Sequence, residues 1–159
     1  MQRDMGHFLV FVIMESQDDV RPRVADAFAR YEERVAGDEN AIHVAYYLLG
    51  GRWHAALTGQ RPDDLAKIPS ADAVLTGQPP HWLPRAEPDP YTDQPDGNVC
   101  PVAAIPADVL PDALLWPGGA MEFFGWCPGP PEREAARDAV QRLRRTHAAM
   151  YVAAVDAKA

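Results

Sequence analysis

The chain has 159 residues, of which 47% are apolar and 24% are charged, which fits one globular domain and excludes disorder along its whole length. Its formal net charge of −8 argues against nucleic acid as a partner, because phosphate binding needs a clustered excess of lysine and arginine. The longest apolar run, 8–14, is too short to cross a bilayer and no signal-peptide cleavage pattern follows it, so we expect a cytoplasmic protein without a membrane partner.

The first third of the chain shows a strand pattern, a helix pattern and a second strand pattern. Residues 7–14 form a continuous apolar run rich in β-branched and aromatic side chains, typical of a strand covered on both faces. A helix that ends at Gly37 is expected next, because apolar residues recur at helical spacing: Val24, Phe28, Tyr31 and Val35. Residues 42–49 then predict a second strand, which ends at Gly50 and Gly51.

The middle of the chain is rich in proline and in acidic residues. Fifteen of the sixteen prolines fall within residues 62–131, and this segment holds ten acids against two bases, so it carries the whole net charge. Apolar residues also recur there, which favours packing over a solvated linker. We therefore predict a single domain over residues 1–159, within which residues 55–111 form an acidic, proline-rich insertion.

The last third repeats the pattern of the first. Residues 113–116 predict a short strand before a turn at 117–119, and proline and acids stand at 130–134, where they favour a helix N-terminus. Residues 150–156 predict the closing strand. The resulting order is that of an α+β, ferredoxin-like βαββαβ fold, in which two helices cover one face of a four-stranded antiparallel sheet and the insertion joins the second and third strands.

The segment after the second predicted strand, Gly50–His54, combines groups suited to ligand binding. Two glycines let the backbone approach a ligand closely, and Arg52, Trp53 and His54 then offer a guanidinium, an indole and an imidazole. Together these groups could hold an anion or a planar molecule and move a proton. The alternative is structural: the glycines form a bulge, Trp53 fills the core, and Arg52 pairs with an acid such as Glu122.

A second cluster, Met121–Cys127, surrounds one carboxylate with aromatic side chains. An apolar setting raises a carboxyl pKa, which would suit Glu122 to general acid or base catalysis. If Arg52 and Glu122 meet, they form either a structural ion pair or the polar anchor of a pocket. Aromatic residues of both clusters would form the walls of that pocket: Tyr47, Trp53, Phe123 and Trp126. A core β-hairpin is the alternative for this segment.

Metal and thiol chemistry receive no support from residue spacing. No C-x-x-C, H-x-x-x-H or H-E-x-x-H pattern occurs, although a zinc site assembled from residues distant in the sequence stays open. Cys100 has no neighbouring base that would lower its pKa, and Cys127 lies beside aromatic residues. We therefore predict neither a metal nor a cofactor.

Both clusters resemble the motifs of a family of uncharacterised bacterial and phage proteins. That pattern runs W-D-W-Y-x-x-G-G-R-W and then M-G-W-F-G before a terminal strand, and the two motifs correspond here to Val44–Trp53 and Met121–Gly125. Ala45 replaces the acidic residue of the first motif, and Glu122 replaces the first glycine of the second. The resemblance nominates the matching residues as a site without implying a reaction: Tyr47, Gly50, Gly51, Arg52 and Trp53.

These observations lead to two functional hypotheses. The first is a cofactor-independent small-molecule enzyme of isomerase, cyclase or hydrolase type, in which His54 or Glu122 performs acid–base chemistry and Arg52 holds an anionic or enolate oxygen. Its pocket would lie between the sheet and the insertion. The second is an interaction or regulatory module that acts through the acidic insertion on a basic partner. The expected sheet also favours a homodimer.

Overall fold

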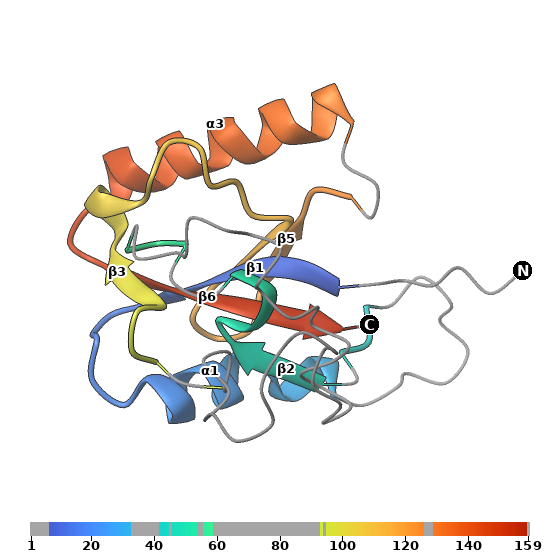
Figure 1. The fold of residues 1–159 in the computed structure, drawn as a ribbon, viewed down its shortest axis with the longest axis vertical. Coiled ribbons are helices and arrows are strands. Elements are labelled where there is room, and N and C mark those ends of the chain that lie inside the picture. The colour runs from blue at the N-terminus through green and yellow to red at the C-terminus, as the bar shows by residue number, and fades with distance from the viewer. Residues whose placement is uncertain are drawn as a thin grey trace, which may run out of the picture.

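The computed structural model describes residues 7–32, 42–44, 46–53, 56–58, 93, 95–125 and 129–158, and of Arg52 it describes the backbone alone. Within these residues the chain forms a six-stranded, mostly antiparallel sheet with one helix against each face (Figure 1). The mixed α+β class expected from the sequence is therefore confirmed.

The centre of the sheet is an antiparallel pair of eight-residue strands, β1 (His7–Met14) and β6 (Tyr151–Lys158). The pairing runs without a break from His7 opposite Lys158 to Met14 opposite Tyr151. Nearly every residue of both strands is buried, which agrees with the unbroken apolar runs in the sequence. The two ends of the chain thus form the core of the molecule together.

Four shorter strands complete the sheet. Along the outer edge of β6 lie β2 (Tyr46–Leu49) and β3 (Val99–Pro101), both antiparallel to it. On the other side of β1 lies β4 (Ala113–Leu115), which is parallel to β1, and β4 then pairs with β5 (Met121–Phe123) in an antiparallel hairpin. The main path of the sheet is β2-β6-β1-β4-β5.

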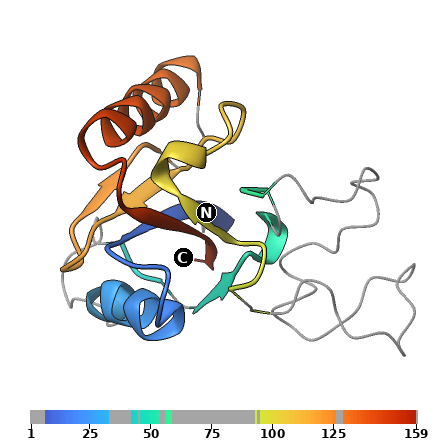
Figure 2. The ribbon, with the colours of Figure 1, turned by 90° about the vertical axis from the view of Figure 1, so that its left-hand side faces the viewer.

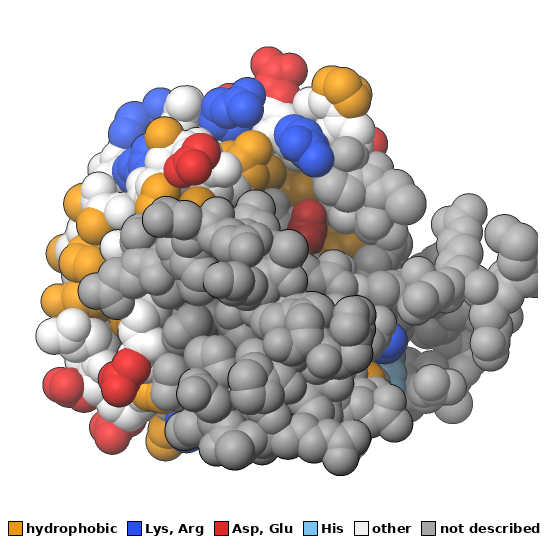
Figure 3. Space-filling view, viewed as in Figure 1, with side chains coloured by type: hydrophobic (Ala, Val, Ile, Leu, Met, Phe, Trp, Pro, Cys, Tyr) orange, Lys and Arg blue, Asp and Glu red, His pale blue; other side chains and the backbone are white. Residues whose placement is uncertain are grey.

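The two helices pack on opposite faces of this sheet (Figure 2). The short helix α1 (Val20–Phe28) covers the face that carries Phe8, Val10 and Val12 of β1. The longer helix α3 (Pro130–Thr146) covers the face that carries the alternate residues of the same strand, Leu9, Phe11 and Ile13. Basic side chains of α3 lie at the surface along the top of Figure 3, as expected for a solvated helix face.

This arrangement corrects three details of the predicted ferredoxin-like order. That fold has a four-stranded antiparallel sheet with both helices on one face, whereas here the sheet has six strands, β1 and β4 are parallel, and the helices lie on opposite faces. The physical reason lies in β1 itself. Both of its faces are apolar, so each face needs a helix to exclude water.

The predicted insertion is described only in part. Residues 59–92 lie outside the described residues, whereas the C-terminal end of the predicted segment, 95–111, packs into the fold through β3 and the buried side chains of Val102 and Ile105. Asp93 connects this end to two other elements: its Oδ1 accepts a 2.7 Å hydrogen bond from the N–H of Leu49, and its Oδ2 lies 2.7 Å from Nη1 of Arg21. None of the described helices is long and apolar enough to cross a membrane.

Candidate functional site

In the turn that follows β2, two glycines lie against buried polar side chains. Gly50 has φ +88° and Gly51 has φ +47°, in the region that favours glycine. A Cβ atom on Gly50 would lie 2.5 Å from Nδ2 of Asn98, and one on Gly51 would lie 2.5 Å from Cβ of Asp156. The two glycines are therefore required by both backbone conformation and space, and the groups that they approach closely are side chains of the protein itself, whereas the sequence suggested an approach to a ligand.

Asn98 and Asp156 are the polar residues that the described core buries completely, each with 0% exposure. Oδ1 of Asp156 lies 2.9 Å from Nδ1 of His7, and the two side chains are 0% and 2% exposed. Strand alternation places both side chains on the face covered by α3, because Val152 and Ala154 of β6 also point there. A buried histidine–aspartate pair thus lies directly beneath the glycine turn.

A cavity of about 250 Å³ opens on the same face, between the start of α3 and the glycine turn. Its apolar wall includes Leu9, Trp53 and Phe124, and its polar wall includes Asp112 and Arg133. Leu9 lies directly opposite Asp156 in the β1–β6 ladder, and Trp53 is two residues after Gly51. The cavity and the histidine–aspartate pair therefore share their neighbours, although His7 and Asp156 do not themselves line it.

Asp112 is the carboxylate best placed for chemistry in this cavity. Its Oδ2 accepts a 2.8 Å hydrogen bond from the N–H of Leu9, while its own N–H donates to the carbonyl of Leu9 at 2.8 Å. Its carbonyl accepts the N–H of Phe124 at 2.9 Å. Burial raises the pKa of the Asp112 carboxyl, and the Leu9 N–H and the charge of Arg133 oppose that rise. The backbone of β1 thus holds a perturbed carboxyl at the cavity wall.

The charges around the cavity are not balanced. Asp108, Asp112 and Glu132 contribute three carboxylates, whereas Arg133 contributes one guanidinium. Glu132 also caps α3, since its Oε2 accepts the N–H of Gly129 at 3.0 Å. Among the described residues, no ion pair joins Arg133 to any of these carboxylates.

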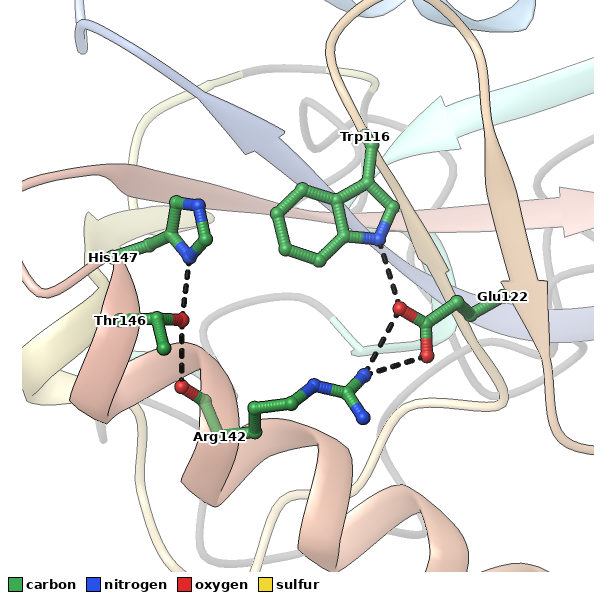
Figure 4. Close-up of polar contacts among 5 residues, drawn as sticks. All are labelled: Trp116, Glu122, Arg142, Thr146 and His147. Atoms are coloured by element: carbon green, nitrogen blue, oxygen red, sulfur yellow. Dashed lines mark hydrogen bonds and ion pairs between the residues drawn. The ribbon is translucent and has the colours of Figure 1, made fainter.

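Glu122 belongs to a different cluster, shown in Figure 4. Its Oε1 accepts a 3.1 Å hydrogen bond from Nε1 of Trp116, and Nη2 of Arg142 lies 3.0 Å and 2.8 Å from its two carboxylate oxygens. The side chains of Glu122 and Arg142 are 39% and 50% exposed. His147 meets the Trp116 ring edge-on, with 5.0 Å between ring centroids. This group, which we call the edge cluster, ties β5 to α3 at the surface.

The residues predicted for the site lie on different faces of the sheet or outside the described residues. Trp53 lines the cavity, but Tyr47 stacks on Phe28 at 4.5 Å, and Phe123 meets the ring of Phe8 at 5.8 Å, both on the opposite face, towards α1. Adjacent residues of a strand point to opposite faces, which sends these two aromatic rings away from the cavity. The side chain of Arg52, and all of His54 and Trp126, lie outside the described residues.

Sequence reasoning missed the acidic side chains that the fold places on this face. Asp156 stands inside an otherwise apolar strand, where a buried charge needs a partner, and Asp112 stands directly before a fully buried strand. Both positions can be recognised in the sequence and could have identified these two aspartates as candidates. The partner of Asp156, His7, opens β1, at the other end of the chain.

Thiol and metal chemistry gain no support from the described residues. Burial raises the pKa of the Cys100 thiol to about 11, against a smaller opposing effect of Arg144, so the reactive thiolate is disfavoured. No group of three or more histidine, cysteine, aspartate or glutamate side chains in the described ranges is close enough together to hold a metal ion.

Comparisons with protein-family models, with curated proteins and with solved structures give no match for this chain. The family suggested by the two motifs therefore stays a prediction, and the functional argument rests on the geometry of the cavity.

Proposed function

We propose that the chain is a small-molecule enzyme that works by acid–base chemistry in the cavity between Trp53 and the start of α3. One observation carries this proposal. Asp112, a carboxyl whose pKa is raised by burial, lines a cavity of about 250 Å³ that also has aromatic walls. Perturbed titratable groups in small, partly apolar cavities are typical of active sites.

In this proposal Asp112 moves the proton. A raised carboxyl pKa brings the group closer to neutral pH, where it can take a proton from a substrate and return it at another atom. Arg133 lies in the same wall and would stabilise negative charge that develops on a substrate oxygen. Trp53 and Phe124 would exclude water and hold the substrate body. Isomerisation, cyclisation and hydrolysis all fit such a set of groups without a cofactor.

Arg52 and His54 remain proposed partners in this reaction. Both belong to the segment that carries Trp53, and Trp53 is part of the cavity wall. Arg52 would hold an anionic or enolate oxygen, and His54 would exchange protons with the substrate or with Asp112. Glu122 is left out of the proposal, because its carboxylate is already paired with Trp116 and Arg142.

The alternative hypothesis, an interaction module that acts through the acidic insertion, rests mostly on residues outside those described. It stays a prediction, as does the homodimer.

The test is a screen for proton transfer. The protein is incubated in D2O with a panel of small carbonyl, ester and amine compounds, and exchange or conversion is followed by NMR. Replacing Asp112 by asparagine preserves shape and an acceptor for the Leu9 N–H but removes the titrating group. We expect Asp112→Asn to lower turnover about 100-fold, as for the loss of a general acid or base.

The matched control is Asp138→Asn, which removes the same charge from an exposed position of α3 outside the cavity. It should retain turnover. Arg52→Ala and His54→Ala test the two proposed partners in the same assay. Full turnover in a folded Asp112→Asn protein would overturn the assignment of this site, and the absence of turnover for the whole panel would count against an enzyme.

A further inference from the structure

We infer that the ligand of the cavity beside Trp53 is a small organic cation, a protonated amine that carries an apolar or aromatic body. The inference rests on the proposed function, since both place a small molecule in the same cavity. It adds the chemical class of that molecule, which three properties of the cavity wall support.

The wall of the cavity carries an excess of negative charge. Three carboxylates, Asp108, Asp112 and Glu132, face one guanidinium, that of Arg133. The described residues contain no ion pair between Arg133 and these carboxylates, so the negative charge is not neutralised by direct contact. A cavity with an excess of one sign of charge attracts a ligand of the opposite sign. An anionic ligand would meet Arg133 but also three like charges.

The carboxylate of Asp112 accepts one hydrogen bond from the described residues. Its Oδ2 accepts the N–H of Leu9, and no described residue donates a hydrogen bond to its Oδ1. A partly buried carboxylate oxygen gains most from a charged donor. An ammonium group supplies three N–H donors and the compensating charge at once.

Two aromatic residues also line the cavity. Trp53 and Phe124 line the same cavity as the carboxylates, and cations are attracted to the faces of such rings. The aromatic and aliphatic parts of the wall, which include Leu9 and Ala136, also accept the apolar body of a ligand. A volume of about 250 Å³ is below the usual range of roughly 300–1,000 Å³ for ligand sites, which restricts the ligand to a small molecule.

A metal ion is the other cation that carboxylates can bind, and the geometry argues against it. A divalent ion needs several oxygen ligands that converge on one point. Asp108, Asp112 and Glu132 do not form such a group, because the described residues hold no set of three potential ligands close enough for a metal. Carboxylates spread around a wall suit an extended organic cation instead.

The experiment is a direct binding measurement that does not depend on turnover. The full chain is titrated with 2-phenylethylamine hydrochloride by calorimetry, and in parallel with the anion 3-phenylpropanoate, which has a similar body. We expect the amine to bind at least about tenfold more tightly than the anion, and its affinity to fall as salt is added. Asp112→Asn should weaken amine binding at least about tenfold, whereas the control Asp138→Asn should leave it unchanged.

Two outcomes would overturn the inference: binding of the anion as tight as that of the amine, or unchanged amine affinity in a folded Asp112→Asn protein. If Asp112→Asn does not fold, Asp108→Asn provides the same test, because Asp108 lies at an exposed turn. Absence of amine binding to the parent protein also overturns it. Amine binding without proton transfer would instead count against the proposed enzyme and leave the ligand class intact.

Discussion

The face of the sheet covered by α3 carries two clusters with the same three groups and opposite properties. The cavity holds the indole of Trp53, the carboxylate of Asp112 and a guanidinium, and the edge cluster holds the indole of Trp116, the carboxylate of Glu122 and a guanidinium. In the edge cluster the indole N–H and Arg142 both bind the carboxylate. In the cavity the carboxylate accepts a backbone N–H, and the guanidinium forms no ion pair with it.

This difference shows that residue type alone does not determine whether a carboxylate is paired with other side chains after folding. Glu122 has the aromatic neighbours that made it a candidate, yet its hydrogen-bonding capacity is used by protein groups at the surface. Asp112 has a less conspicuous sequence context, yet it lines a cavity, and no described residue donates a hydrogen bond to its Oδ1. Whether a carboxylate can bind a ligand depends on which of its oxygens still lack a hydrogen-bond partner after folding.

The largest effect on stability is expected from the buried pair beneath the cavity. Asp156→Ala removes the carboxylate bonded to His7 and leaves that imidazole in a site where the side chain is 2% exposed. Breaking a buried pair in this way typically costs about 3–5 kcal/mol. Urea denaturation should therefore show a loss of that size in the free energy of unfolding. A loss below about 1 kcal/mol would mean that the pair is not a structural support of the cavity.

Gly51→Ala should have the next largest effect. The new Cβ would lie 2.5 Å from Cβ of Asp156, and φ at this position is +47°, so both overlap and backbone strain contribute. We expect a loss of about 2–4 kcal/mol in the free energy of unfolding. Gly118→Ala is the matched control, because Gly118 also has positive φ but no heavy atom within 4 Å of the new Cβ. Equal losses for both variants would show that contact with Asp156 contributes nothing.

The pH dependence of stability tests the carboxyl in the cavity. The folded-state pKa of Asp112 is raised by burial, so the folded chain holds this proton more tightly than the unfolded chain does. This contribution to stability is complete below the unfolded-state pKa of about 3.9 and is lost as the pH rises through the raised folded-state value.

Consequently, the free energy of unfolding of the parent protein should fall relative to that of Asp112→Asn as the pH rises from about 4 through the raised folded-state pKa of Asp112. Chemical denaturation of both proteins across this range measures the difference, and Asp138→Asn shows the change that an exposed acid of α3 produces. A difference that does not vary with pH would contradict the assigned environment of Asp112.

The smallest effect is expected in the edge cluster. Glu122→Gln retains a partner for the Trp116 N–H and removes an ion pair whose side chains are 39% and 50% exposed. Exposed pairs contribute about 0.2–1 kcal/mol and are weakened by salt. Thermal or urea unfolding should show a loss in this range that shrinks at high salt. A loss above about 2 kcal/mol would place Glu122 among the structurally essential residues and remove the contrast with the cavity.

Much of the local structure follows from residue pattern. The apolar runs at 7–14 and 150–156 predict β1 and β6 to within a few residues, and the proline and acids at 130–134 mark the start of α3. The glycine turn after the second strand is also where the sequence places it. By contrast, the predicted strand 42–49 is shorter in the structure, where β2 covers only Tyr46–Leu49. A residue pattern does not predict at which residue a strand begins to pair with its neighbour in the sheet.

The candidate site was predicted less well. Trp53 lines the cavity, whereas Tyr47 and Phe123 point to the opposite face, since their strand positions have the other parity. Asp112 could not be identified from its neighbours in sequence. Its partners, Leu9 and Arg133, lie far from it along the chain, and no short-range pattern connects them.

The sequence by itself determined that the first and last strands are buried on both faces, that two amphipathic helices accompany them, and that the turn at Gly50 and Gly51 needs glycine. These are properties of a residue and its near neighbours. Only the tertiary structure decided that the helices lie on opposite faces, that His7 meets Asp156, and that Asp112 lines a cavity while Glu122 pairs with Arg142. Those outcomes depend on strand order and register, which bring together groups from both ends of the chain and fix which side chains find partners.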